Sequence, residues 1–106
     1  MSAMAVTRQV DAQTIGKTFA ESVRDLGFVR SVHVRETPDW LEVWVVTEPI
    51  DILDEEPLYE AGVNLRRRFP GAGVLIHVVN PNDYPDRYDL VQHVVPTRAK
   101  TVAASH

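Results

Sequence analysis

Apolar residues recur at every third or fourth position in two stretches of this chain, which is the spacing of a helix with one buried face. The first stretch carries them at Ile15, Phe19, Val23 and Leu26. Asp11 before this stretch is a good N-cap residue, and Gly27 after it is typical of a helix end. The pattern therefore predicts a helix over residues 12–26.

The second stretch lies between Asp54, which suits an N-cap, and the helix-ending pair Pro70-Gly71. Its apolar positions are Leu58, Ala61, Leu65 and Phe69. Acidic residues at 55–56 and arginines at 66–68 suit the two ends of a helix dipole. A glycine inside a helix costs about 1 kcal/mol relative to alanine, so Gly62 predicts close packing against a sheet.

Three further stretches have the pattern of strands. Residues 28–37 alternate from Val32 onward, and residues 40–48 alternate after the turn residues Pro38-Asp39, which predicts an antiparallel hairpin. In the second of these strands one face carries Leu41, Val43 and Val45, and the other carries Trp40, Glu42, Trp44 and Val46. Residues 73–80 are nearly all apolar, as is typical of a central strand.

The C-terminal part of the chain has a weaker pattern. Residues 88–96 fit a short helix as well as a strand. Residues 97–102 could add a final edge strand, whereas 97–106 as a whole are expected to form a flexible end, as are residues 1–10.

Together these elements predict a single α+β domain over residues 1–106. Its order is helix, strand, strand, helix, strand and a short C-terminal element, in a two-layer sandwich with both helices on one face of the sheet. The other face is expected to carry His33, Arg35, Trp40, Glu42, Trp44 and His77.

This order resembles the core of small bacterial nucleotidyltransferase-fold proteins over residues 11–95, and it also suits a ferredoxin-like fold. In the nucleotidyltransferase family, the first strand ends in Gly-Ser and the next begins with Asp-x-Asp, which holds magnesium. The corresponding strands here read Ser31-Val-His-Val-Arg-Glu36 and Asp39-Trp-Leu-Glu-Val-Trp-Val-Val46. Trp40 and Glu42 replace the two aspartates, so the resemblance implies a relative without the catalytic motif.

The amino-acid composition excludes several classes of protein and of functional site. The residues are 44% apolar and 25% charged, as in a globular domain, and the formal net charge is −4. The lack of cysteine excludes disulfide scaffolds, thiolate zinc sites and cysteine nucleophiles. No apolar run reaches the ~18 residues of a membrane span, and no secretory signal is visible, so we expect a cytoplasmic protein without membrane contact. Because the sequence has neither a phosphate loop nor a G-x-S-x-G motif, we predict no cofactor and no catalytic residue.

The histidines and tryptophans are the candidate site residues. His33, His77 and Glu42 would form a zinc site if their strands were adjacent, but solvated or hydrogen-bonded histidines are more common than ligands. Trp40 and Trp44 share a face with Glu42. If this face is exposed, the pair marks a contact surface, and if the terminal segment covers it, the pair completes a second small core.

Charge is unevenly distributed along the chain. Residues 36–60 contain nine carboxylates and no lysine or arginine, which suits a basic partner and disfavours phosphate, although a solubilising surface is the more common explanation. The three arginines at 66–68 are the only basic cluster. Successive helical residues point about 100° apart, so a structural role is favoured over phosphate binding.

These observations predict a small non-catalytic protein-binding or regulatory module, such as an accessory subunit or an antitoxin-like protein, with a protein partner or a second copy of itself. Its contact surface would consist of Trp40, Glu42, Trp44, His33 and Arg35. The first alternative is a degenerate nucleotidyltransferase-fold protein that binds a nucleotide near Glu42. The second is an RNA binder on the same sheet face, which the acidic balance disfavours.

Overall fold

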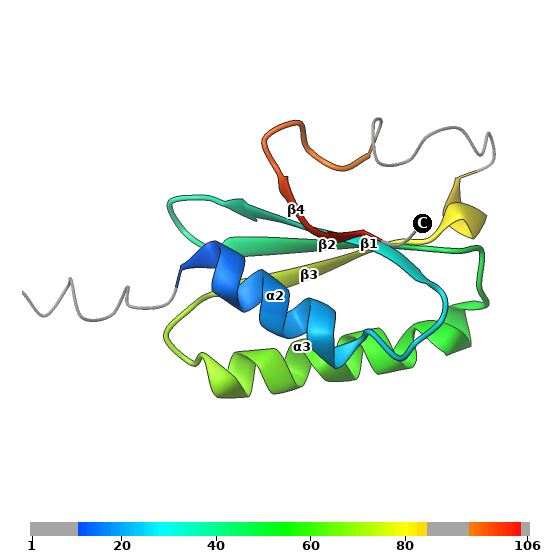
Figure 1. Cartoon of the computed structure of the whole chain (residues 1–106), viewed down its shortest axis with the longest axis horizontal. Helices are drawn as coiled ribbons and strands as arrows, with labels where there is room; N and C mark the ends of the chain where they lie inside the picture. The colour runs from blue at the N-terminus through cyan, green and yellow to red at the C-terminus, as the bar shows by residue number, and fades with distance from the viewer. Residues whose placement is uncertain (1–10, 85–93, 105–106) are drawn as a thin grey trace, which may run out of the picture.

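The computed structural model describes residues 11–84 and 94–104. Its two helices form one layer and its four strands form the other, which confirms the predicted two-layer α+β architecture (Figure 1). The main elements are α2 (Ala12–Ser22), β1 (Val29–Glu36), β2 (Leu41–Thr47), α3 (Glu56–Arg68), β3 (Val74–Val79) and β4 (Lys100–Ala104). Two short 3₁₀ helices, η1 (Ile52–Glu55) and η2 (Pro81–Asp83), precede α3 and follow β3.

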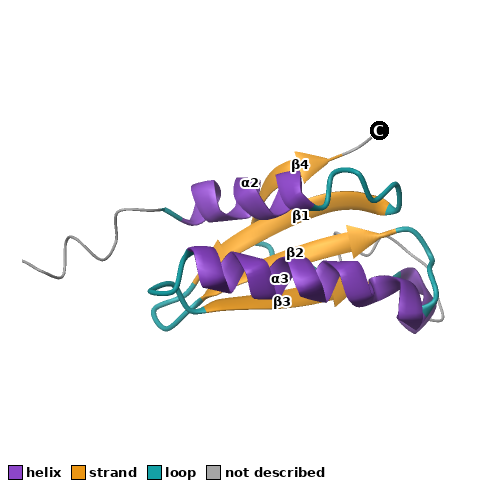
Figure 2. Ribbon diagram, turned by 90° about the horizontal axis from the view of Figure 1, so that it is seen from below, coloured by secondary structure: helices purple, strands orange, loops and turns teal. Residues whose placement is uncertain are grey.

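The four strands lie in the order β3-β2-β1-β4. β1 and β2 form the predicted antiparallel hairpin, and β4 pairs antiparallel with the other edge of β1. α3 crosses over the sheet and brings β3 parallel to β2, so that α2 and α3 cover the same face (Figure 2). β3 is thus an edge strand among the described residues, and the prediction of a central strand over residues 73–80 is wrong. Its apolar residues pack under α3 on one face of the sheet, and Val79 packs with Val46 and Val95 on the other.

The main core lies between the two helices and the sheet. It contains the helix residues Ile15, Phe19, Leu58 and Leu65 and the inward-facing strand residues Leu41, Val43 and Val45, as the two periodicities predict. Gly62 confirms the predicted close approach, because a Cβ atom added there would lie 2.7 Å from Ile76 Cγ1. Gly16 plays the same part in α2, where an added Cβ would overlap with Val34.

The helix boundaries differ from the predictions. α2 ends at Ser22 and not near Leu26, and Gly27 does not have the left-handed backbone expected of a helix-ending glycine. The Ser22 hydroxyl donates to the Phe19 carbonyl at 2.7 Å, a local bond that competes with helix continuation. Asp54 does not cap α3, because it lies inside η1, which runs directly into the helix.

The C-terminal predictions have mixed outcomes. β4 occupies Lys100–Ala104, so a flexible end over residues 97–106 is wrong there, and the alternative of a final edge strand is confirmed. The strand forms because β1 offers it an unpaired edge. The ambiguous segment 88–96 falls mostly outside the described residues, as does the N-terminal segment 1–10. Within the described ranges, neither helix has the length and apolarity to cross a membrane.

Candidate functional site

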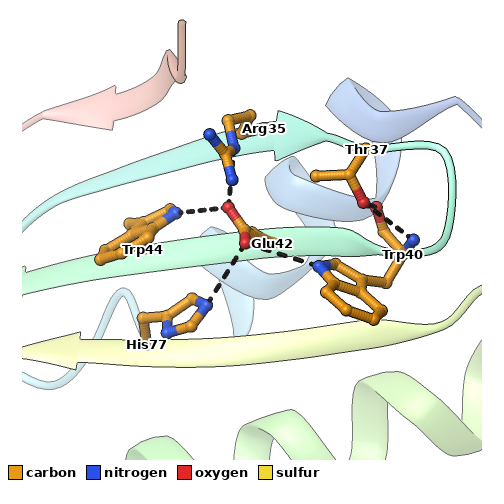
Figure 3. A network of polar contacts seen from close by, with 6 residues as sticks. All are labelled: Arg35, Thr37, Trp40, Glu42, Trp44 and His77. Atoms are coloured by element: carbon orange, nitrogen blue, oxygen red, sulfur yellow. Dashed lines mark hydrogen bonds and ion pairs between the residues drawn. The ribbon is translucent and has the colours of Figure 1, made fainter. Parts of the chain in front are cut away.

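The sheet face opposite the helices carries the side chains predicted for it. Strand register arranges them in two rows across the sheet. One row consists of His33, Trp44 and His77, and the next consists of Arg35, Glu42 and Leu75. We call the group formed by Arg35, Trp40, Glu42, Trp44 and His77 the Glu42 cluster (Figure 3).

The buried carboxylate of Glu42 is the centre of this cluster. Glu42 is 7% exposed, and its Oε1 accepts hydrogen bonds from Arg35 Nε at 2.8 Å and Trp44 Nε1 at 3.3 Å. Its Oε2 accepts a third, longer bond from Trp40 Nε1 at 3.4 Å (Figure 3). Burial by itself raises the pKa of Glu42, but the three hydrogen bonds and the charge of Arg35 outweigh it and lower the pKa. The carboxylate is therefore ionised at neutral pH and orients three side chains.

Trp40 sits where the hairpin turn meets β2. The Thr37 hydroxyl donates to the Trp40 carbonyl at 2.8 Å and accepts from the Trp40 N–H at 3.0 Å. The Thr37 N–H donates to the same carbonyl at 2.8 Å. The indole is tethered to Glu42, yet Trp40 remains 44% exposed. The turn thus presents a large aromatic surface on a well-fixed backbone.

Trp44 has a different environment, although it is on the same face. Its indole stacks on His77, with ring centroids 4.1 Å apart and an angle of 18° between the planes. The side chain also packs against a second core made of Val46, Val79 and Val95, with Tyr84, Val94 and Ala99 at its margin. Each tryptophan therefore matches a different one of the two alternatives, a second core or an exposed contact surface. The segment around Val95 covers Trp44 and completes a second core, whereas Trp40 is exposed.

His33 belongs to a separate polar group between β1 and β4. It is 4% exposed, with Nε2 2.8 Å from Ser31 Oγ and Nδ1 3.0 Å from Thr101 Oγ1. Burial lowers the pKa of His33. The prediction that His33 contacts a partner is wrong, because both ring nitrogens are engaged inside the domain. Its role is to join two strands.

The zinc site considered from the sequence does not form. His77 Nε2 lies 3.9 Å from Glu42 Oε2, and it is buried without a hydrogen-bond partner. His33 binds Ser31 and Thr101 instead of approaching this pair. Within residues 11–84 and 94–104, no three histidine, aspartate or glutamate side chains come together as a metal site would require.

The acidic stretch 36–60 is not one surface. Glu36 and Asp39 lie at the hairpin turn, whereas the carboxylates from Glu48 to Glu55 follow the other end of β2, about 20 Å away for a strand of this length, and Glu56 and Glu60 lie on α3. Glu48 pairs with Arg30 at 3.4 Å. Glu55 is buried and accepts hydrogen bonds from Tyr59 at 3.2 Å and Asn80 at 2.8 Å. Several of these carboxylates therefore have local structural roles.

The arginine cluster at the end of α3 also has structural contacts. Arg66 Nε donates to the carbonyl of Val74 at 2.9 Å, which joins the helix to the start of β3. The Arg68 guanidinium lies 5.7 Å from the centre of the Phe69 ring. These contacts support the structural interpretation of the cluster.

No family model, curated protein or solved structure matches this chain. The resemblances to nucleotidyltransferase-fold and ferredoxin-like proteins therefore stay predictions.

We expect Glu42→Gln to make stability less sensitive to acid. The pKa of Glu42 is lower in the folded state than its ordinary value of 4.5. Its ionised form therefore stabilises the fold above that value, and this contribution is lost as the pH falls through the folded pKa. The Glu42→Gln variant does not titrate at this position, so it lacks this acid-dependent loss of stability. At pH 7 its free energy of unfolding should be about 1–2 kcal/mol lower, because the hydrogen bonds lose a charged acceptor.

Urea unfolding at a series of pH values measures this effect. The matched control is Glu60→Gln on the exposed surface of α3, which should leave the acid sensitivity of the wild type unchanged. Equal acid sensitivity in wild type and Glu42→Gln would show that Glu42 is not preferentially ionised in the folded state.

Proposed function

We propose that this chain is a small, non-catalytic protein-binding module that contacts its partner through Trp40 on the outer sheet face. The observation that carries the proposal is an exposed indole that lies beside a buried carboxylate, on a hairpin backbone fixed by Thr37. Thr37 fixes the backbone of Trp40, and the hydrogen bond from the indole to Glu42 favours one orientation of the ring, which reduces the side-chain entropy lost when a partner covers it. Tryptophan is also enriched among the residues that dominate interface energies.

The residues predicted for the contact surface have different roles in this proposal. Trp40 is the anchor, and the partly exposed Arg35 and Leu75 lie in the neighbouring row. Glu42 accepts the hydrogen bond from the Trp40 indole, and Trp44 packs against the second core. A fitting partner has an apolar pocket for the indole and a basic group near the exposed Asp39 at the hairpin turn. A cytoplasmic accessory or antitoxin-like subunit would use such a surface.

The nucleotide-binding and RNA-binding alternatives have less support. The guanidinium of Arg35 is paired with Glu42, and His33 is buried, so two of the groups expected to meet a phosphate or a base are engaged. A calorimetric titration with magnesium and a nucleotide tests the first alternative, and salt-dependent RNA binding tests the second.

We expect Trp40→Ala to weaken binding of the partner by at least about 30-fold, the effect of losing an interface residue worth about 2 kcal/mol. The free energy of unfolding should fall much less, because nearly half of the side chain is already exposed. Affinity capture from the native host identifies the partner, and calorimetry with the purified partner measures the affinity. Leu53→Ala is the matched control, since Leu53 is an exposed apolar residue in η1, away from this face.

The two tryptophans also provide a direct probe of the surface. The chain contains only these two, so each indole N–H gives a distinct NMR resonance. Adding the partner should shift the resonance of Trp40 more than that of Trp44. Unchanged affinity in Trp40→Ala, or a larger shift at Trp44, would place the contact elsewhere.

A further inference from the structure

β3 has the sequence of a central strand but the position of an edge strand. It reads Val74-Leu-Ile-His-Val-Val79, without lysine, aspartate, glutamate or proline. Edge strands commonly carry such residues, because they prevent pairing with another chain. The opposite edge strand, β4, does carry one, Lys100. β3 therefore lacks the protection expected of an edge that faces solvent.

The pairing of β3 with β2 determines which of its backbone groups point outward. The Gly73 carbonyl accepts from the Leu41 N–H at 2.6 Å and so faces β2. Alternate residues face opposite ways, so the N–H and C=O groups of Val74, Ile76 and Val78 point to the outer edge. Arg66 binds the Val74 carbonyl. Among the described residues, no strand pairs with Ile76 and Val78 on that side.

The side of α3 that borders this edge is apolar at its centre. Tyr59, Val63 and Arg66 follow one another at intervals of four and three residues, so they share one helix face. Arg66 reaches the outward carbonyl of β3, which places this face beside the open edge. Tyr59 is 48% exposed and Val63 is 43% exposed. Figure 2 shows α3 running along β3.

This edge is complementary to itself about a two-fold axis. α3 runs opposite to β3, because it connects two parallel strands. If two β3 strands pair antiparallel with Ile76 opposite Val78, the two α3 helices also lie antiparallel. Because Gly62 packs on Ile76, the two-fold axis at His77 passes near the middle of α3. Tyr59 of one copy then lies within one helical turn of Val63 of the other. The exposed Glu56 at the start of α3 lies within one turn of the exposed Arg67 of the other copy.

We propose that the chain forms a homodimer in which two β3 strands pair antiparallel and join the two sheets into one. In the dimer, β3 becomes a central strand, which accounts for its apolar sequence. Opposite charges meet at both ends of the helix pair, and apolar residues meet in its middle. The proposal goes beyond the protein-binding function, because it uses the β3 edge and not the surface around Trp40.

The full chain provides the first test. Sedimentation equilibrium is expected to show twice the monomer mass of 11.9 kDa. Hydrogen exchange should show protected amides at Ile76 and Val78, and this protection should decrease on dilution as the dimer dissociates. In a monomer these two amides would exchange much faster than those of Leu75 and His77, which face β2.

A charged residue in the apolar centre provides the second test. Val63→Lys should raise the dissociation constant of the dimer at least tenfold, because it places two lysines in the contact. The variant should fold, since the substituted side chain is largely exposed. The control is Asn64→Lys, which adds the same charge to the next exposed residue but on a helix face turned about 100° away. It should leave the dissociation constant nearly unchanged.

Charge exchange tests the two-fold arrangement itself. Glu56→Arg and Arg67→Glu should each weaken the dimer by about tenfold, because like charges then meet at two symmetric places. An equimolar mixture of the two variants should recover association, since each introduced arginine then faces an introduced glutamate and the native pair remains at the other end.

Three outcomes would overturn the proposal. One is a monomer mass at concentrations up to about 1 mM, the dissociation constant of a weak complex. Another is protection of Ile76 and Val78 that does not change with concentration, which would mean that a segment of the same chain covers β3. The third is a dimer that persists in Val63→Lys. Trp40→Ala should leave the dimer intact. A failure of the dimer proposal can therefore be distinguished from a failure of the proposed partner binding.

Discussion

Phe19→Ala is expected to lower the free energy of unfolding by about 3–5 kcal/mol. The Phe19 side chain is 0% exposed and lies in the middle of α2, where it fills the core between that helix and the sheet. Truncation removes buried apolar area and leaves a cavity in the core between α2 and the sheet. Leu65→Ala on α3 should cost about 2–5 kcal/mol for the same reason.

Urea unfolding followed by circular dichroism measures both losses. Gln13→Ala, at an exposed position of α2, is the control and should change stability by less than about 0.5 kcal/mol. If either core variant costs as little as this control, the corresponding helix does not pack on the sheet as described.

Trp44→Ala is expected to cost about 3 kcal/mol, clearly more than Trp40→Ala. Trp44→Ala removes the stacking on His77, a hydrogen bond to Glu42 and the contacts with the second core. Trp40 loses only a long hydrogen bond and a half-exposed surface. The comparison is well matched, because the two variants remove the same side chain from the same face of one hairpin.

The urea midpoints of the two variants decide whether the second core contributes to stability. Equal losses would mean that the segment around Val95 adds little to the environment of Trp44. A large loss in Trp40→Ala would instead show that the exposed indole is structural, which would weaken its assignment as an interface anchor.

Local patterns were sufficient to predict the two layers and the face on which each strand residue lies. In β2, strict alternation places Val43 in the core and Glu42 on the opposite face, whatever the neighbouring strands are. In the helices, the stripes that contain Phe19 and Leu65 can only be buried against another layer. These predictions are confirmed because each depends on the geometry of a single element.

The remaining features depend on contacts between distant residues. Nothing in the sequence around His33 indicates that Thr101, 68 residues later, binds its ring and buries it. The convergence of Arg35, Trp40 and Trp44 on Glu42 requires the hairpin register as well as the face of each residue. The edge position of β3 was missed because an apolar run does not reveal how many strands flank it.

The pairing of β4 with β1 has a consequence for the order in which the domain assembles. β1 is made early and lies inside the sheet, yet its second neighbour is made only when residues 100–104 are synthesised. A nascent chain can form α2 and the hairpin first, but until then it exposes an unpaired edge of β1, and Nδ1 of His33 lacks its partner Thr101. Chaperones and proteases recognise exposed strand edges. A chain interrupted before β4 therefore exposes the edge of β1 to them, whereas pairing with β4 covers this edge.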